Sequence, residues 1–242
     1  MYVVIDAPSI DGYPSGFSQF WARAFFAQNV STDYQIFALA STYVRVVESA
    51  LIEYRLGQER LREFWETGDT FKLSAAHRAI THFETCLSNM YRATNCFRRL
   101  RRHRAQDPLS LELNKHRPAF ASDPIAKRFN QLSHEVHHME ELVTNGQLKQ
   151  GQQFVLGPTG PEVAHPTEAN QTIKTIDRLA IGEHELLFIE LAAWLQEMKT
   201  MADQIANFVP PAHPSLPPET PNPSIEGMPK RLRLLCTPHV KR

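Results

Sequence analysis

The sequence feature that most constrains the fold is a pair of long apolar stripes with the spacing of an α-helix. Between residues 32 and 66, apolar side chains recur three or four positions apart, as they must on one face of a helix. Their positions are Ile36, Ala40, Tyr43, Val47, Ala50 and Tyr54. The stripe between residues 123 and 145 is the most regular in the chain and comprises Ile125, Phe129, Leu132, Val136, Met139 and Val143. We expect each stripe to lie on an amphipathic helix that buries one face.

The same periodicity predicts three further helices. They are a short helix over Phe17–Ala27, a long one that starts at Ser74 and ends in a run of arginines, and a last one over Glu183–Phe208. Gly57 weakens the interior of the helix over 32–66 and marks a place where it could kink or split. Asp123-Pro124 is a strong helix start, because Asp accepts hydrogen bonds from free amides and Pro fits the first helical position.

One hairpin and a proline-rich tail complete the predicted fold. Residues 153–156 and 161–164 flank a Gly/Pro turn, which is typical of a β-hairpin. Nine prolines fall from Pro210 to Pro238, a composition that disfavours regular structure. We therefore predict an all-α, antiparallel bundle of four to five helices over 16–209, with one short β-hairpin before the last helix. An N-terminal arm (1–15) and a disordered tail (210–242) flank it.

Charge and cysteine content limit the classes of function. The 26 basic and 26 acidic residues balance, so any contact with nucleic acid needs a local patch. The three cysteines are an odd number without a CxxC spacing, which favours a reducing, cytoplasmic location. We find no signal peptide and no uninterrupted apolar run of membrane-spanning length, so no membrane contact is expected. No phosphate-binding glycine loop or HExxH motif occurs, so no cofactor is expected.

The segment from Arg128 to Glu141 carries the richest set of reactive side chains. If the apolar stripe of this helix faces the core, then His134, His138 and Glu141 point away from it. The simplest interpretation is a solvated helix face that contains histidines. A second is a metal site formed by His134, His138 and Glu141, although the chain has no second ExxH motif of the kind that di-metal bundles require.

A third interpretation comes from a resemblance. Arg128, five intervening residues and His134 resemble the Rx4–6H motif of the HEPN (higher eukaryotes and prokaryotes nucleotide-binding) superfamily. The resemblance implies a helical bundle that dimerises and cleaves RNA without metal. In it, His134 would act as general acid or base, Arg128 would stabilise charge on the phosphate, and Asn130 would orient it.

Two departures from the family pattern affect this interpretation. Phe129 follows Arg128 where the family usually has a polar residue. In a second register, Leu132 to Glu141 is similar to the family's "RN…EH-D/E-E" stretch, and Ser133 then occupies the position of the arginine. That register would imply a family member without the catalytic arginine.

A basic cluster closes the helix that starts at Ser74. Basic side chains are favoured at a helix C-terminus, where free carbonyls carry partial negative charge, so the cluster has a purely local explanation. Its alternative role is to contact phosphate groups. The residues concerned are Arg98, Arg99, Arg101, Arg102 and Arg104.

Three functions are therefore compared. The first is a non-catalytic, HEPN-like helical domain that acts through protein–protein contacts, as a homodimer or with another protein. The second is a metal-independent RNA endonuclease that uses Arg128 and His134, with RNA as its ligand. The third is a metal-binding helical-bundle protein.

Overall fold

The protein is described by a computed structural model. The structure describes residues 1–10, 12, 17–26, 33–66, 72–103, 107–147 and 153–209, without the side chains of 103, 137–140, 142, 153 and 154. All of these residues belong to the compact unit Met1–Pro210. Both the predicted disordered tail (210–242) and Arg104 lie outside the described residues.

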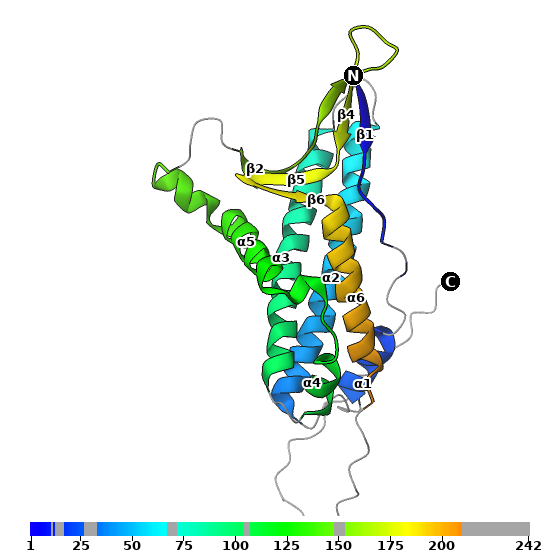
Figure 1. The fold of residues 1–242 in the computed structure, drawn as a ribbon, viewed down its shortest axis with the longest axis vertical. Helices are drawn as coiled ribbons and strands as arrows, with labels where there is room; N and C mark the ends of the chain where they lie inside the picture. Colours follow the sequence, from blue (N-terminus) through cyan, green and yellow to red (C-terminus); the bar gives the residue numbers. More distant parts are fainter. Residues whose placement is uncertain are drawn as a thin grey trace, which may run out of the picture. The chain divides into compact units, whose positions relative to one another are not determined.

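Two long antiparallel helices, α2 (Tyr34–Trp65) and α3 (Leu73–His103), form the centre of the fold (Figure 1). Asp33 begins α2 by accepting a hydrogen bond from the backbone amide of Gln35 at 2.8 Å. The predicted stripe of α2 is buried along its whole length, from Ile36 to Tyr54. Gly57 does not break α2. A Cβ at this position would lie 2.8 Å from the Phe83 ring, so the absence of a side chain leaves room for Phe83.

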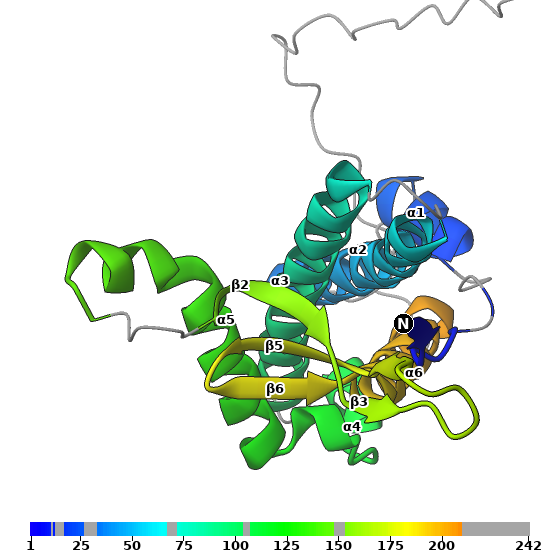
Figure 2. The same ribbon diagram turned by 90° about the horizontal axis from the view of Figure 1, so that it is seen from above.

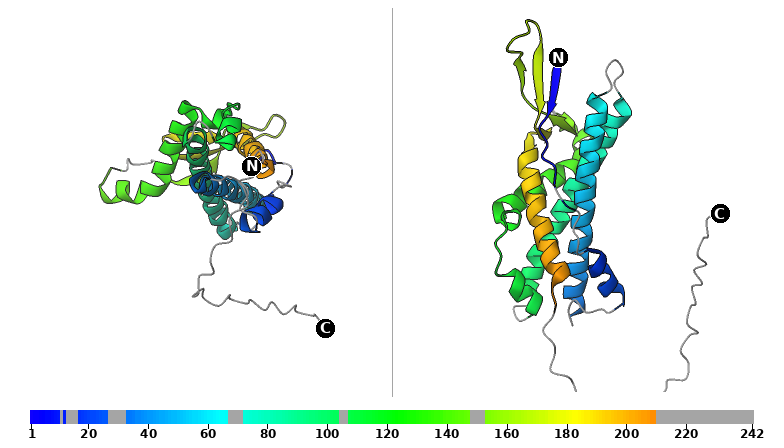
Figure 3. Two further views of the ribbon diagram at one scale, coloured as in Figure 1. Left: turned by 90° about the horizontal axis from the view of Figure 1, so that it is seen from below. Right: turned by 90° about the vertical axis from the view of Figure 1, so that its right-hand side faces the viewer.

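The remaining helices pack around this pair and confirm that the fold is mostly helical. They are α1 (Phe17–Phe26), α4 (Pro108–Leu113), the 3-10 turn η1 (Ala119–Ala121), α5 (Asp123–Thr144) and α6 (Phe188–Asn207). Figure 3 shows α6 running beside α2, and the Tyr43 hydroxyl donates to the Met198 carbonyl at 3.0 Å between them. The helix predicted over Glu183–Phe208 begins later, at Phe188, because residues 184–187 form a strand instead.

The prediction of an all-α fold with one hairpin is wrong in its β part. The structure has two three-stranded sheets: β1-β4-β3 and β2-β5-β6. The strands are β1 (Tyr2–Ile5), β2 (Gln153–Thr159), β3 (Glu162–Ala164), β4 (Thr172–Ile176), β5 (Arg178–Gly182) and β6 (His184–Leu187). Figure 2 shows β5 and β6 running between α5 and α6.

The expected hairpin does not form because β2 and β3 belong to different sheets. β2 pairs with β5, and β3 pairs with β4. Gly160 lies where the chain passes between the sheets, and a Cβ there would come within 1.8 Å of the Thr175 carbonyl oxygen. This close approach of two backbones explains the need for glycine at the turn.

The N-terminal arm, expected to be a loop, contains β1. This strand runs parallel to β4, with Tyr2 opposite Ile173 and Ile5 opposite Ile176. The chain then follows α2, where the Tyr54 hydroxyl donates to the Pro8 carbonyl at 2.8 Å and the Gln58 amide donates to the Ala7 carbonyl at 2.8 Å. A pocket of about 350 Å³ lies beside this segment. The pairing partner of β1 is almost the whole chain away, so local sequence could not reveal it.

One helix of the described residues, α2, is long and apolar enough by length and composition to cross a membrane. Its mean hydropathy over the best window is 1.2, and 39% of that window is buried inside the protein. The core helix of a soluble protein meets the same criterion, and the buried residues of α2 belong to the core. The expectation of no membrane contact therefore stays a prediction.

Candidate functional site

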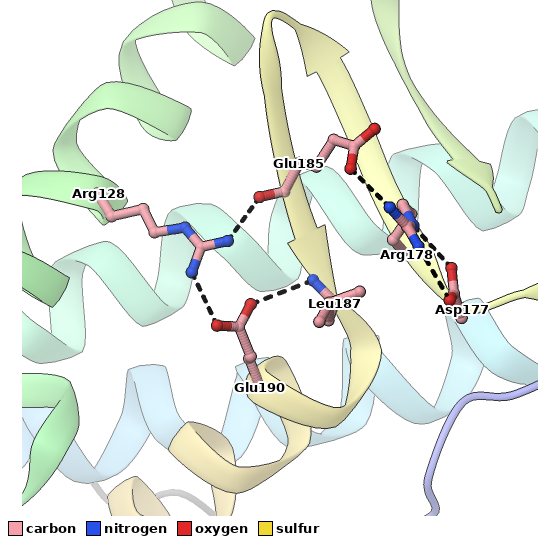
Figure 4. A network of polar contacts seen from close by, with 6 residues as sticks. All are labelled: Arg128, Asp177, Arg178, Glu185, Leu187 and Glu190. Carbon is pink, nitrogen blue, oxygen red and sulfur yellow. Dashed lines mark hydrogen bonds and ion pairs between the residues drawn. The ribbon is translucent and has the colours of Figure 1, made fainter. Parts of the chain in front are cut away.

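Arg128 is held by protein groups on several sides (Figure 4). One guanidinium nitrogen, Nη1, lies 3.0 Å from Glu190 Oε1, and the other, Nη2, donates to the Glu185 carbonyl at 2.6 Å. The Arg128 Cζ atom lies 5.6 Å from the centre of the Trp194 ring, a cation–π distance. Glu190 and Trp194 are on α6, and Glu185 is on β6. Arg128 therefore joins α5 to both elements.

The contacts of Arg128 continue into a second arginine. The second carboxylate oxygen of Glu190 accepts the Leu187 amide at 3.4 Å and so closes the first turn of α6. The Glu185 side chain binds Arg178 at 2.7 Å, and Arg178 also donates to Asp177 at 2.7 Å. Hydrogen bonds to Asp177 and then Glu185 raise the pKa of Arg178. Each of the two arginines thus has protein acceptors in place.

The predicted catalytic residues are not brought together. Asn130 and His134 are exposed, whereas the Arg128 side chain is only 33% exposed and points to α6. At 100° per residue, His134 lies about 120° and Asn130 about 160° around the helix from Arg128. Asn130 and His134 share a face, but Arg128 is on a different one. Within the described ranges, Glu135, on the same helix, forms no ion pair with Arg128; its Oε1 atom lies 3.9 Å from His184 Nε2.

The candidate metal ligands cannot all be placed. His134 and Glu141 are exposed, and the side chain of His138 is not described. Among the residues that the structure describes, no group of three or more His, Cys, Asp or Glu side chains could hold a metal ion. The metal site of His134, His138 and Glu141 stays a prediction.

The two halves of α5 differ in how they contact the rest of the protein. In the first half, Phe129 and Leu132 are each 2% exposed and belong to the core. Further along, the helix leaves the bundle (Figure 1). Val136 still packs against the core, whereas Val143 is 53% exposed. Ser133, which one register puts in place of the family arginine, is buried. The apolar stripe of α5 is thus longer than the part of it that its own core covers.

Two arginines of the basic cluster of α3 have protein partners. Arg98 forms an ion pair with Asp123, and Arg101 lies 3.3 Å from the Asn114 side chain and over the Phe97 ring. Burial lowers the pKa of Arg101, and the charges of nearby arginines lower it further. Those arginines are Arg117, Arg102 and Arg98.

A pocket of about 800 Å³ lies between the start of α2 and the end of α3. The side chains of α3 that line it are Asn95, Arg98, Arg99 and Arg102, and those of α2 are Tyr34, Gln35, Ala38 and Leu39. The sequence identified these arginines as a phosphate-binding candidate. It did not identify the α2 side of the pocket, because that depends on which helix lies beside α3.

Comparisons with known proteins assign this chain to no family. No protein-family model, no curated protein and no solved structure matches it. The HEPN resemblance therefore rests on the motif residues of α5 and on the helical architecture alone, and it stays a hypothesis.

Proposed function

We propose that the protein is a non-catalytic, HEPN-like helical domain that acts through protein–protein contacts, with a second copy of itself as partner. The observation that carries the proposal is the exposed end of the apolar stripe of α5. The predicted stripe continues past Val136, which still packs against the core, to Val143, which is 53% exposed. An amphipathic helix that extends beyond its core has an apolar face left for a partner. The dimers that the family resemblance implies make a second copy the partner of choice.

The contacts of Arg128 support the proposal that the domain is non-catalytic. A catalytic arginine must be available to a substrate phosphate, but both terminal nitrogens of Arg128 donate to protein acceptors, and its Cζ atom lies over the Trp194 ring. Binding a phosphate would require these charge-assisted hydrogen bonds to break, at a cost of about 1.5–3 kcal/mol each. Asn130 and His134 lie on another face, so no phosphate could meet all three residues without a rearrangement.

Sedimentation equilibrium over a range of protein concentrations tests the contact. We expect wild-type protein to form a dimer and Val143→Asp to shift it towards monomer, because a buried unpaired carboxylate is costly in an apolar interface. Val163→Asp is the matched control, since Val163 is 57% exposed on β3 and lies outside the proposed contact. A monomeric wild type, or equal behaviour of the two variants, would contradict the proposal.

The alternative function is a metal-independent ribonuclease. An RNA cleavage assay in EDTA distinguishes it from the non-catalytic domain. The proposal predicts no cleavage by wild-type protein. Cleavage that is lost in His134→Ala would establish the enzyme instead, with Arg128 released from Glu190 when RNA binds.

Elemental analysis of the purified protein tests the third function, since a stoichiometric metal would point to His134, His138 and Glu141. A cytoplasmic location without membrane contact is also part of the proposal, and cell fractionation tests it.

A further inference from the structure

The pocket between α2 and α3 has two unlike walls. The α3 wall supplies three guanidinium groups and the Asn95 amide, all within two turns of helix. The α2 wall supplies the Tyr34 ring, which is 79% exposed, and the apolar side chains of Ala38 and Leu39. A helix-dipole explanation accounts for arginines at the end of α3. It does not account for an aromatic and apolar wall facing them.

The positive charge on the α3 wall is only partly neutralised. Arg98 has Asp123 as its ion-pair partner, but in the described part of the chain neither Arg99 nor Arg102 forms an ion pair. Both of these side chains are exposed. Burial lowers the pKa of Arg101, and the positive charges of Arg117, Arg102 and Arg98 lower it further. Guanidinium donors that have no protein acceptor are available to bind the oxygens of an anion.

The backbone of the α2 wall also favours the binding of an anion. Tyr34 and Gln35 are the first residues of α2, where the helix macrodipole places partial positive charge. Asp33 already accepts the Gln35 and Ile36 amides, so the start of the helix is capped and does not itself provide the site. The guanidinium groups of α3 carry the recognition, and the N-terminus of α2 adds a favourable potential.

We propose that this pocket binds an organic phosphate, with the phosphate group on Arg99 and Arg102 and the organic part against Tyr34, Ala38 and Leu39. Arginine suits this task because its planar donors pair with two phosphate oxygens at once. The volume of about 800 Å³ accepts a nucleotide-sized ligand. Asn95 and the second donor group of Arg98 are placed to complete the contacts. This inference does not depend on the proposed function, since it uses neither α5 nor self-association.

The same chemistry has two sources, a free small phosphate ester and a nucleotide within single-stranded RNA. Isothermal titration calorimetry with inorganic phosphate, AMP and an unstructured oligouridine distinguishes them. AMP binding that the oligonucleotide does not exceed indicates a small ligand, and tighter oligonucleotide binding indicates RNA. Both outcomes support the organic phosphate site, and binding should weaken as salt is added.

Variants on the two walls test the geometry. Arg99→Gln/Arg102→Gln should weaken AMP binding at least about tenfold, because each lost charged hydrogen bond is worth 1.5 kcal/mol or more. Arg78→Gln, on the opposite end of the same helix and equally exposed, is the matched control and should leave binding unchanged. Tyr34→Ala should weaken AMP binding while leaving the weaker binding of inorganic phosphate unchanged.

Three results would overturn the proposal. They are no binding of any probe by wild-type protein, equal loss in Arg78→Gln and the double variant, or inorganic phosphate binding as tightly as AMP. Since Arg99 and Arg102 are exposed, the double variant should unfold in urea like wild type. If it does not fold, Arg102→Lys keeps the charge but loses the paired donors, and unchanged AMP binding in it would contradict the arginine geometry.

Discussion

The two halves of α5 continue one apolar stripe but differ in what surrounds them. Each half has polar residues on the face opposite the stripe. Yet the first half is fixed to the bundle by Phe129, Leu132 and Arg128, while Val143 in the second half is exposed. The difference arises from what lies beside each part. Arg128 contacts α6 and β6, and Glu135 still lies 3.9 Å from His184 of β6, whereas Val143 near the end of the helix is exposed.

This comparison changes how the Arg/His motif should be interpreted. In the sequence, Arg128 and His134 are a candidate catalytic pair on one helix. In the structure, Arg128 belongs to the anchored half as the residue that ties α5 to Glu190 and to the Glu185 carbonyl. The role of an arginine is decided by its partners, and the partners of Arg128 are structural. Arg99 and Arg102, by contrast, face a pocket.

The largest expected effect is on stability, and it compares how deeply the two halves of α5 are buried. Phe129→Ala should lower the free energy of unfolding by about 3–4 kcal/mol, because it leaves a cavity beside Trp194. Val143→Ala, in the other half of the same stripe, should change it by less than about 0.5 kcal/mol in the monomer. Urea unfolding at low protein concentration measures both values. Similar losses in the two variants would mean that the second half is also packed into the core.

A smaller effect is expected for the polar anchor. Arg128→Ala should lower the free energy of unfolding by about 2 kcal/mol, since Glu190 and the Glu185 carbonyl lose a charged donor in a half-buried position. Lys127→Ala is the control from the exposed face next to it and should be neutral within about 0.5 kcal/mol. The same urea titrations compare them. An Arg128→Ala variant as stable as Lys127→Ala would return Arg128 to the candidates for ligand binding.

The sequence predicted the five longer helices well because each carries its own periodic signal, but it did not predict α4 or η1. The stripes of α2 and α5, the start of α5 near Asp123-Pro124 and the last helix are all found, with boundaries shifted by a few residues. The end of α6 was correct, but its start was placed at Glu183 because the Glu183–Leu187 stretch has apolar residues that fit a helix or a strand. Their strand state depends on pairing with β5, as Leu186 does with Leu179.

The sheets were missed for a physical reason. A strand of four or five residues has no stable conformation of its own, and its state is set by partners that the local sequence does not name. Tyr2–Ile5 pairs with residues far along the chain, and β2 and β3 exchange the expected hairpin for pairing with β5 and β4. The basic cluster was found from sequence because its arginines are close together in the chain. The Tyr34 wall of its pocket was not found, because Tyr34 faces these arginines only through the packing of α2 against α3.

The most direct test of the account is amide hydrogen exchange along α5 at increasing protein concentration. The account predicts slow exchange at Phe129–Leu132 at every concentration, because this half belongs to the core of the protomer. Exchange at residues 139–143 should be fast in dilute solution and slow once the second copy covers it. Fast exchange at residues 139–143 at all concentrations, or equally slow exchange in both halves in dilute solution, would contradict the division of α5 into an anchor and a contact surface.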